Sequence, residues 1–395
     1  MKKITTYLAG CLLVFALPLA RGVEPIRIEH DIIVPGMVKP IPVAITGFSG
    51  EALEVLKFDL YVQGFSFVAP DAAKFVISGT DTSSVTGSLT DTTSKEVKFS
   101  RAYNGANARR QAHAFADDIV NTILPHPGIP GIGQSKIAFK SQNGGYGPGE
   151  IYVADFDGAA AQTVTSDHAI VAKPAWVPHT LAMYYTSYTK DNPDIFYHNL
   201  STGQRRTIAN YSGLNTSAAV SPDGSKVAMV LSKSGSPSIW VSNPDGSDLK
   251  RITYGVEDSS PCWSPDGKWI CFATKQNGRR RLAKVPAEGG TVQYLSTTGA
   301  SSPSEPDWSP DGKWIAFTSQ SGSYFNICVM PADGSMLPVV LVSGQNPSWA
   351  QNSRTLVYNH GPDGRQTLSV LDVFTKQSKD CRRAAGSNSQ PAWAR

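Results

Sequence analysis

The feature that most constrains this chain is a short phrase that recurs six times between residue 174 and the C-terminus. Each copy ends at an anchor position that lies 41 to 45 residues after the previous one, and tryptophan fills five of the six anchors. A four-stranded β-propeller blade needs about 40–45 residues, and repeats of this period are typical of such folds. The spacing therefore predicts one blade for each copy. The six anchors are Trp176, Val220, Trp263, Trp308, Trp349 and Trp393.

The residues that follow the anchors predict the strands of each blade. Ser-Pro-Asp-Gly occupies residues 221–224, 264–267 and 309–312. Proline presets a negative φ and glycine accepts a positive one, so the chain turns there. Short runs of β-branched and aromatic residues follow these turns, and no helical period of 3.6 residues appears. The repeat region is therefore expected to form blades of four antiparallel strands.

The two ends of the repeat region complement one another. A β-rich segment at residues 136–139 has no anchor phrase before it, and the last anchor phrase, at residues 391–393, has no strands after it. We expect the C-terminal strand to supply the inner strand of the first blade, so that residues 131–395 form a six-bladed propeller without an open edge. The anchor tryptophans are then expected to pack between neighbouring blades rather than to form a ligand cage.

Residues 23–130 carry no such repeat and predict a small α/β domain. Apolar residues at helical spacing predict helices over residues 51–63, with Ser49 as the cap, and over residues 106–124. A linker rich in proline and glycine is expected at residues 127–131. Strands are expected at residues 41–46, 73–78 and 96–101.

Residues 1–22 have the features of a cleavable signal peptide. The basic pair Lys2 and Lys3 precedes an apolar stretch over residues 7–19, and the small residues around Arg21 place the mature start at Val23. That stretch is too short to span a bilayer comfortably, and no later segment approaches the necessary length. We therefore expect an exported, soluble monomer with no membrane span of its own.

The charge of the mature chain argues against a nucleic-acid partner. Removal of the leader takes away three basic residues and no acidic ones, which lowers the formal charge from +4 to +1. Nucleic-acid binding needs a concentrated basic face. The dense basic runs at residues 279–281 and 382–383 are interpreted instead as solvated loops.

No residue pattern in the sequence indicates catalysis, a metal site or a cofactor. Neither G-x-S-x-G nor H-E-x-x-H occurs, and the seven histidines lack ligand spacing. Four cysteines remain after cleavage and allow three pairings, among which the sequence does not choose. Cys262 and Cys271 flank a turn and are expected to share a face as diagonal neighbours. Buried free thiols are the favoured interpretation of the cysteines.

The export signal, the small α/β domain and the Pro-x-Trp-Ser-Pro-Asp-Gly repeats together resemble the TolB family of the Tol–Pal envelope system. The resemblance covers nearly the whole mature chain, although Val220 replaces the aromatic anchor of the second repeat. It implies a periplasmic, non-enzymatic protein whose propeller holds the peptidoglycan-associated lipoprotein Pal. It also implies that the mature N-terminus binds the C-terminal domain of TolA, and that the system maintains outer-membrane integrity and supports cell division.

The resemblance further implies that the lipoprotein contacts one face of the propeller. The loops that enter the anchor phrases emerge on this face, and the Ser-Pro-Asp-Gly turns lie on the other. The candidate contacts are Asn215, Ser217, Asp258, Ser259, Ser260, Glu305 and Asn346.

The predicted N-terminal tail, residues 23–30, has the period of an extended strand with one apolar side. Such a segment can add to an exposed sheet edge of another protein, although Pro25 removes one backbone donor. The alternative is that it pairs with the sheet of its own domain. The candidate contacts with TolA are Val23, Glu24, Ile26, Arg27 and Ile28.

Two further classes of function remain open at the level of the sequence. A propeller enzyme, such as a lyase or glycosidase, would need convergent carboxylates and a pocket in the central channel. A periplasmic scaffold could instead bind glycan.

Overall fold

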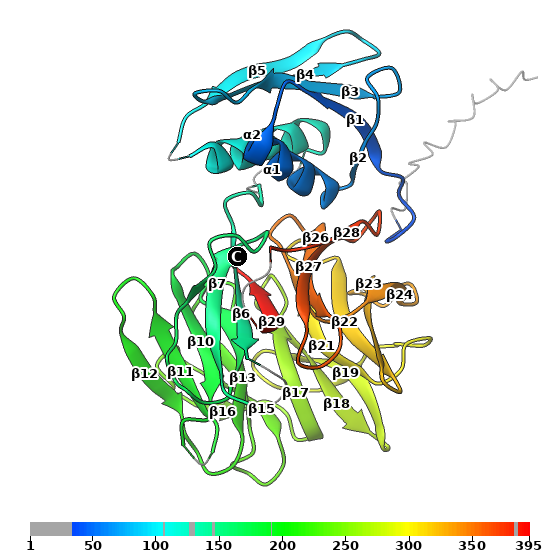
Figure 1. The fold of residues 1–395 in the computed structure, drawn as a ribbon. Helices are drawn as coiled ribbons and strands as arrows, with labels where there is room; N and C mark the ends of the chain where they lie inside the picture. The colour runs from blue at the N-terminus through cyan, green and yellow to red at the C-terminus, as the bar shows by residue number, and fades with distance from the viewer. Residues whose placement is uncertain (1–33, 106, 126–130, 144–146, 191, 383–385) are drawn as a thin grey trace, which may run out of the picture. The chain divides into compact units, whose positions relative to one another are not determined.

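The computed structural model describes residues 34–105, 107–125, 131–143, 147–190, 192–382 and 386–395. The predicted signal peptide, the N-terminal tail and most of the predicted linker lie outside these residues. The described part consists of an α/β region followed by a β-propeller (Figure 1). Both belong to one compact unit, Val34–Arg395.

The N-terminal region is a five-stranded sheet whose strand order is β2-β1-β3-β4-β5. Strand β1 pairs in parallel with β2 and β3, whereas β3, β4 and β5 are antiparallel. The elements are β1 (Ile41–Thr46), α1 (Gly50–Tyr61), β2 (Phe65–Phe67), β3 (Phe75–Thr80), β4 (Val85–Asp91), β5 (Val97–Tyr103) and α2 (Ala108–Ile123).

The two predicted helices and three predicted strands of this region are present, but β2 and β4 were not predicted. The predicted cap of the first helix is only partly right. Ser49 occupies the N-cap position of α1, yet its side chain makes no capping hydrogen bond. Its backbone N–H donates to Asp81 at 3.0 Å instead. In α2 the cap is Asn107, whose side chain accepts a hydrogen bond from the backbone of Arg110 at 2.9 Å.

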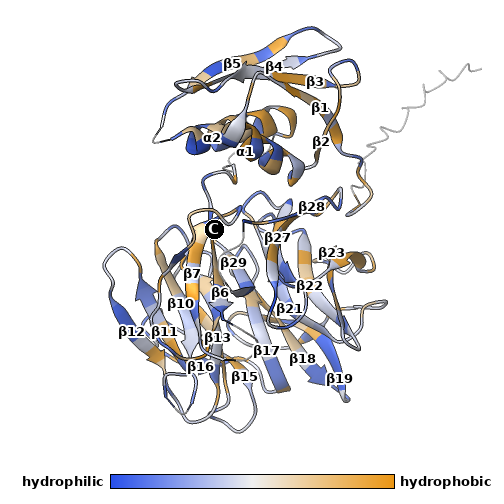
Figure 2. Ribbon diagram, viewed as in Figure 1, coloured by the Kyte–Doolittle hydropathy of each residue, from blue (hydrophilic) through white to orange (hydrophobic). Residues whose placement is uncertain are grey.

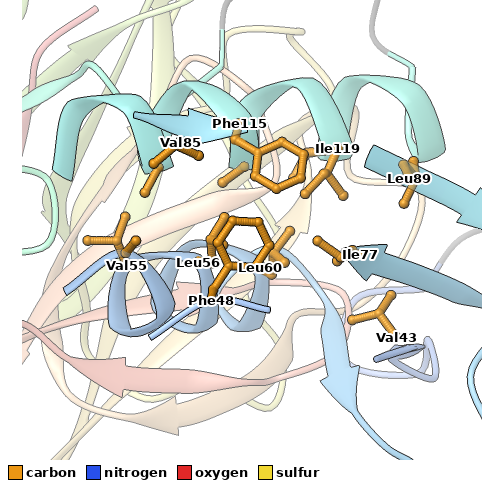
Figure 3. Packing of buried hydrophobic residues seen from close by; sticks show 14 of the residues in the cluster. Val43, Phe48, Val55, Leu56, Leu60, Ile77, Val85, Leu89, Phe115 and Ile119 are labelled. Carbon is orange, nitrogen blue, oxygen red and sulfur yellow. The ribbon is translucent and has the colours of Figure 1, made fainter. Parts of the chain in front are cut away.

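One continuous hydrophobic core lies between the helices and the sheet. Phe115 of α2 is at its centre, fully buried, with Leu60 of α1 and Val85 and Leu89 of β4 also lining the core (Figure 3). The phenyl ring packs directly on the backbone of Gly87, where an added Cβ would lie 2.2 Å from Phe115 Cζ.

The propeller has six sheets of four antiparallel strands, which confirms the predicted fold class. Blade 1 contains β29 (Ser387–Trp393), β6 (Lys136–Gln142), β7 (Gly149–Asp155) and β8 (Gln162–Thr163). Blade 2 contains β9 (Val171–Trp176), β10 (Ala182–Ser187), β11 (Asp194–Asn199) and β12 (Arg205–Ala209). Blade 3 contains β13 (Asn215–Val220), β14 (Val227–Leu231), β15 (Ser238–Ser242) and β16 (Lys250–Arg251).

The remaining blades repeat this order. Blade 4 contains β17 (Val256–Trp263), β18 (Trp269–Gln276), β19 (Arg279–Pro286) and β20 (Gln293–Tyr294). Blade 5 contains β21 (Pro303–Trp308), β22 (Trp314–Ser321), β23 (Tyr324–Pro331) and β24 (Val339–Ser343). Blade 6 contains β25 (Gln345–Trp349), β26 (Thr355–His360), β27 (Thr367–Asp372) and β28 (Ser378–Asp380).

The predicted closure is confirmed by the pairing in blade 1. The C-terminal strand β29 pairs antiparallel with β6, with Trp393 opposite Ile137. The indole N–H of Trp393 also donates to Ser135 Oγ at 2.8 Å, and its ring stacks on Phe156. The inner strand of the first blade therefore comes from the other end of the chain.

The propeller core is divided into six hydrophobic clusters, each of which joins two neighbouring blades. The anchor tryptophans lie in these clusters, as predicted. Trp176, Trp263 and Trp349 each donate an indole hydrogen bond to a backbone carbonyl of the preceding blade, at 2.9 to 3.1 Å. In Figure 2 the apolar residues stand out along strands such as β7, whereas the outer end of β19 is hydrophilic.

The α/β region and the propeller share both apolar and charged contacts. Phe58 and Val62 belong to the cluster that joins blades 6 and 1. Arg109 of α2 forms a buried ion pair with Asp157, in the loop after β7. The backbone N–H of Gly36 also donates to the carbonyl of Val373 at 2.9 Å.

Candidate binding site in the propeller channel

One position of every blade lines the central channel in a conformation that is uncommon for its residue type. The position lies three residues before the anchor and has a φ between 50° and 55° in all six blades. None of these residues is glycine, and a left-handed backbone costs a non-glycine residue of order 1–3 kcal/mol. We call this set the channel ring. It consists of Lys173, Ser217, Ser260, Glu305, Asn346 and Gln390.

A β-bulge explains the shared conformation. In every blade the register between the innermost strand and the next one shifts at or beside the ring residue. A bulge inserts an extra residue into one strand and redirects its side chain, and such bulges are enriched at functional sites. Here six bulges bring six polar side chains to the same level of the channel.

Four of the six members of the channel ring are tied together by hydrogen bonds. The ammonium group of Lys173 lies 3.0 Å from Glu305 Oε1 and 3.0 Å from Asn346 Oδ1. The backbone N–H of Lys173 donates to Gln390 Oε1 at 2.9 Å. Thr318 donates to the second carboxylate oxygen of Glu305 at 2.9 Å. These contacts link blades 2, 5, 6 and 1.

The Glu305 carboxylate is held in its charged form. Burial alone would raise its pKa, but the charge of Lys173 and the hydrogen bonds from Lys173, Thr318 and Asn346 outweigh burial and lower the pKa overall. At neutral pH Glu305 is therefore ionised. The other two members of the ring, Ser217 and Ser260, present short hydroxyl side chains that are half-buried.

The channel ring borders a cavity of about 670 Å³. The cavity extends toward the Ser-Pro-Asp-Gly turns, because Pro222, Pro265 and Pro310 line it together with anchor tryptophans. Arg395 at the C-terminus also lines it, and its guanidinium forms an ion pair with Asp307 and donates to the carbonyl of Trp349 at 3.0 Å. The ring thus separates this cavity from the face on which the chain enters each anchor phrase.

The structure brings four of the predicted propeller contacts together in the channel ring: Ser217, Ser260, Glu305 and Asn346. Ser259, the residue before Ser260, is half-buried. Asn215 and Asp258 are instead buried and structural. The Asn215 amide bonds the carbonyls of Pro193 and Tyr211, and Asp258 accepts hydrogen bonds from Thr253 and Thr274 at 2.5 Å.

Sequence reasoning missed two members of the ring, Lys173 and Gln390. The signal was available, because both stand three residues before an anchor tryptophan, as Ser260 does. The predicted contacts of the tail, from Val23 to Ile28, lie outside the described residues.

The chemistry of the site is that of polar recognition. In the channel, Glu305 and Asp307 are each paired with a cation, so neither is poised as a free acid or base. Within the part of the chain that the structure describes, no three side chains of His, Cys, Asp or Glu converge in a way that could hold a metal ion. Nor does any helix in this part have the length and apolar character needed to cross a membrane.

These features define a closed six-bladed β-propeller protein that carries an N-terminal α/β region and a polar ring in its channel. Residues 127–395 match the family model described as the TolB beta propeller domain. Because this match covers more than half of the sequence, the chain belongs to the TolB propeller family.

Similar proteins are found both by sequence and by structure. The chain is 29% identical over 323 residues to the Tol-Pal system protein TolB of Bordetella pertussis, a match that covers 73% of this chain and 72% of the relative. The crystal structure of TolB from Acinetobacter baumannii is similar with a TM-score of 0.80 at 24% identity, over 92% of this chain and 98% of that one. A putative TolB from Agrobacterium tumefaciens gives a TM-score of 0.53 at 16% identity, over 64% of this chain and 90% of that one.

Proposed function

We propose that this chain is a periplasmic, non-enzymatic component of a Tol–Pal system that helps to maintain outer-membrane integrity and supports cell division. In this proposal the propeller holds the lipoprotein Pal and the N-terminal tail binds TolA. Membership of the TolB family and the similarity to Tol-Pal system proteins support the role. The paired carboxylates of the channel favour binding over catalysis.

The observation that carries the proposal is the channel ring. Six non-glycine residues in left-handed backbone conformations are an energetic cost that recurs in every blade. Strain of this kind clusters at binding and catalytic sites. Ser217 and Ser260 of blades 3 and 4 are the smallest members and leave room for a partner side chain. Lys173 and Glu305 supply opposite charges for specificity.

Substitution of the small ring residues tests the site. Ser217→Arg and Ser260→Arg place a long cation in the channel without removing a core contact. We expect each variant to weaken binding of the purified, lipid-free Pal domain by at least about tenfold, or about 1.4 kcal/mol. The matched control is Thr202→Arg, an exposed position between β11 and β12. Isothermal titration calorimetry measures the affinities. Unaltered binding by both ring variants would show that Pal does not bind at the channel ring.

Asn215 is not a suitable site for such a test. Its side chain is fully buried and holds the loop before β13, so a large substituent there would disturb folding. Some of the predicted contacts, such as Asn215, thus hold the loops that enter the anchor phrases. Others, such as Ser260, line the channel and are available to a partner.

The tail is tested by deletion of residues 23–30. We expect the truncated protein to lose binding to the C-terminal domain of TolA and to retain Pal. Equal loss of both partners would indicate that the segment is a strand of its own domain, which is the alternative raised by its sequence.

A further inference from the structure

Two cysteines lie directly opposite one another in the inner half of blade 4. Cys262 of β17 is the register partner of Cys271 of β18, and Trp263 pairs with Ile270. The two cysteines are therefore cross-strand neighbours, not the diagonal pair that the sequence suggested. Directly opposite residues of an antiparallel pair have side chains on the same face of the sheet.

The ladder places the two backbones at a separation that a disulfide can span. The backbone N–H of Ser264 donates to the carbonyl of Trp269 at 2.8 Å, next to the turn. Hydrogen-bonded and non-hydrogen-bonded pairs alternate along a ladder, so Cys262 and Cys271 form a hydrogen-bonded pair with Cα atoms about 5.5 Å apart. Disulfides join Cα atoms that are roughly 4.4–6.8 Å apart.

The side chains are also in contact. Both residues are buried in the cluster that joins blades 4 and 5, and both are free thiols in the structure. Opposite Cβ atoms of a hydrogen-bonded pair lie near the upper end of the usual range of about 4.5–5.5 Å, whereas a disulfide requires about 3.5–4.5 Å, so the two strands must approach by about 1 Å as the bond forms. The bulge at Ser260 lies two residues away and interrupts the ladder, which gives β17 freedom to close the difference.

We propose that Cys262 and Cys271 are joined by a disulfide bond in the exported protein. This inference rests on the proposed export, because an oxidising compartment is what makes the bond persist. Each thiol gives up its proton as the S–S bond forms. The two electrons reduce the disulfide of an oxidant, a disulfide-exchange protein or glutathione disulfide, whose own S–S bond breaks to give two thiols.

The bond forms before blade 5 covers the pair. Burial raises the pKa of the Cys262 thiol, and hydrogen bonding to Cys271 adds to this effect, so the folded protein holds little of the reactive thiolate. In the folding chain the thiols are exposed and react normally. The finished bond fixes the strand β17, which carries Ser260 to the channel ring.

Cysteine labelling tests the proposal with two internal controls. The full chain is exported to the periplasm of a bacterial host, purified without reductant, unfolded with N-ethylmaleimide present, and analysed by peptide mass spectrometry. We expect one cross-linked peptide pair that contains unlabelled Cys262 and Cys271. Cys328 and Cys381 should be fully labelled, because Cys328 is paired with Phe317 across its strand and Cys381 lies in a different cluster, between blades 6 and 1. Labelling of all four cysteines would overturn the proposal.

A second measurement distinguishes failure of the disulfide from failure of the proposed export. The reduced, unfolded chain is refolded in a glutathione redox buffer, where no export is needed. We expect the same pair to form, and we expect dithiothreitol to lower the melting temperature of the oxidised protein but not that of the Cys262→Ala/Cys271→Ala variant. The bond could form in vitro while the protein from the bacterial host is found in the cytoplasm with four free thiols. That result would contradict the proposed export but not the disulfide geometry. Failure to form it in either preparation would refute the disulfide itself.

Discussion

The α/β region and the propeller bury their apolar residues in different ways. The α/β region has a single core in which Phe115 touches three aromatic neighbours, Phe48, Phe99 and Tyr103. The propeller has six smaller cores, each shared by two blades. A blade is therefore stable only through its neighbours, whereas the core of the α/β region is complete in itself. Destabilisation of one contact between blades should therefore affect the whole propeller. Destabilisation caused by loss of Phe115 should remain within the α/β region.

Removal of residues 391–395 should have the largest effect. The truncation takes half of β29 from blade 1, together with the Trp393 indole and the Arg395–Asp307 ion pair. Since removal of a single buried tryptophan costs about 3–5 kcal/mol, we expect a loss of more than about 5 kcal/mol and unfolding of the whole propeller. Scanning calorimetry measures this, with Arg395→Ala as a milder control. An unchanged melting temperature would contradict the closure.

Phe115→Ala should cost about 3–5 kcal/mol, confined to the α/β region. The matched variant is Phe317→Ala, at a fully buried phenylalanine between blades 4 and 5. All described tryptophans lie in the propeller, so tryptophan fluorescence reports on that region. We expect the fluorescence to change little when the α/β region of the Phe115→Ala variant unfolds. The Phe317→Ala variant should shift the fluorescence transition. Equal shifts of that transition in both variants would show that the two regions unfold as one.

The same contrast explains what the sequence could predict. The anchor phrase occurs six times at a regular interval, so the blades, the closure and the role of the tryptophans follow from spacing alone. Strand β4 was missed because Gly87 interrupts its apolar pattern, and that glycine is required by the close approach of Phe115. Four of the six members of the channel ring were predicted, but pattern alone did not show that the side chains of Asn215 and Asp258 are buried and bonded to their own loops. Those hydrogen bonds depend on tertiary placement.

The ion pair at the boundary of the two regions and the ion pair of the propeller channel should also differ in strength. Arg109 and Asp157 are both more than 90% buried, whereas the side chains of Lys173 and Glu305 are 27% and 23% exposed. Arg109→Met leaves a buried carboxylate unpaired, and we expect a loss of about 3 kcal/mol. The double variant Arg109→Met/Asp157→Asn should recover part of the lost stability.

Lys173→Met should cost no more than about 1 kcal/mol, because solvent screens the channel pair. Urea unfolding measures both variants. A larger loss for Lys173→Met than for Arg109→Met would reverse the comparison and make the channel, not the boundary between the regions, the more strongly coupled site.

The smallest expected effect concerns Asp117, in the middle of α2, and it depends on pH. Burial, and then the negative charge of Asp59, raise the pKa of Asp117 to about 7, although a hydrogen bond from the backbone of Gly133 and the charge of His113 act in the opposite direction. The burial arises because Gly131 packs against the carboxyl group, where an added Cβ would lie 2.1 Å from Asp117 Cγ.

A carboxyl group whose pKa is raised in the folded state binds its proton more tightly there than in the unfolded chain. Its contribution to stability is therefore complete below 3.8, the ordinary pKa of an aspartate side chain, and is lost as the pH rises through about 7. Asp117→Asn removes this loss while keeping an oxygen that can accept the Gly133 hydrogen bond. The full shift corresponds to about 4 kcal/mol, but the carboxyl group is partly accessible to solvent, so we expect the variant to gain about 1 kcal/mol at pH 8. Below pH 3.8, where the aspartate is protonated in both the folded and the unfolded chain, the two proteins should be equally stable. A gain that does not vary between pH 5 and pH 8 would show that the pKa of Asp117 is not raised in the folded protein.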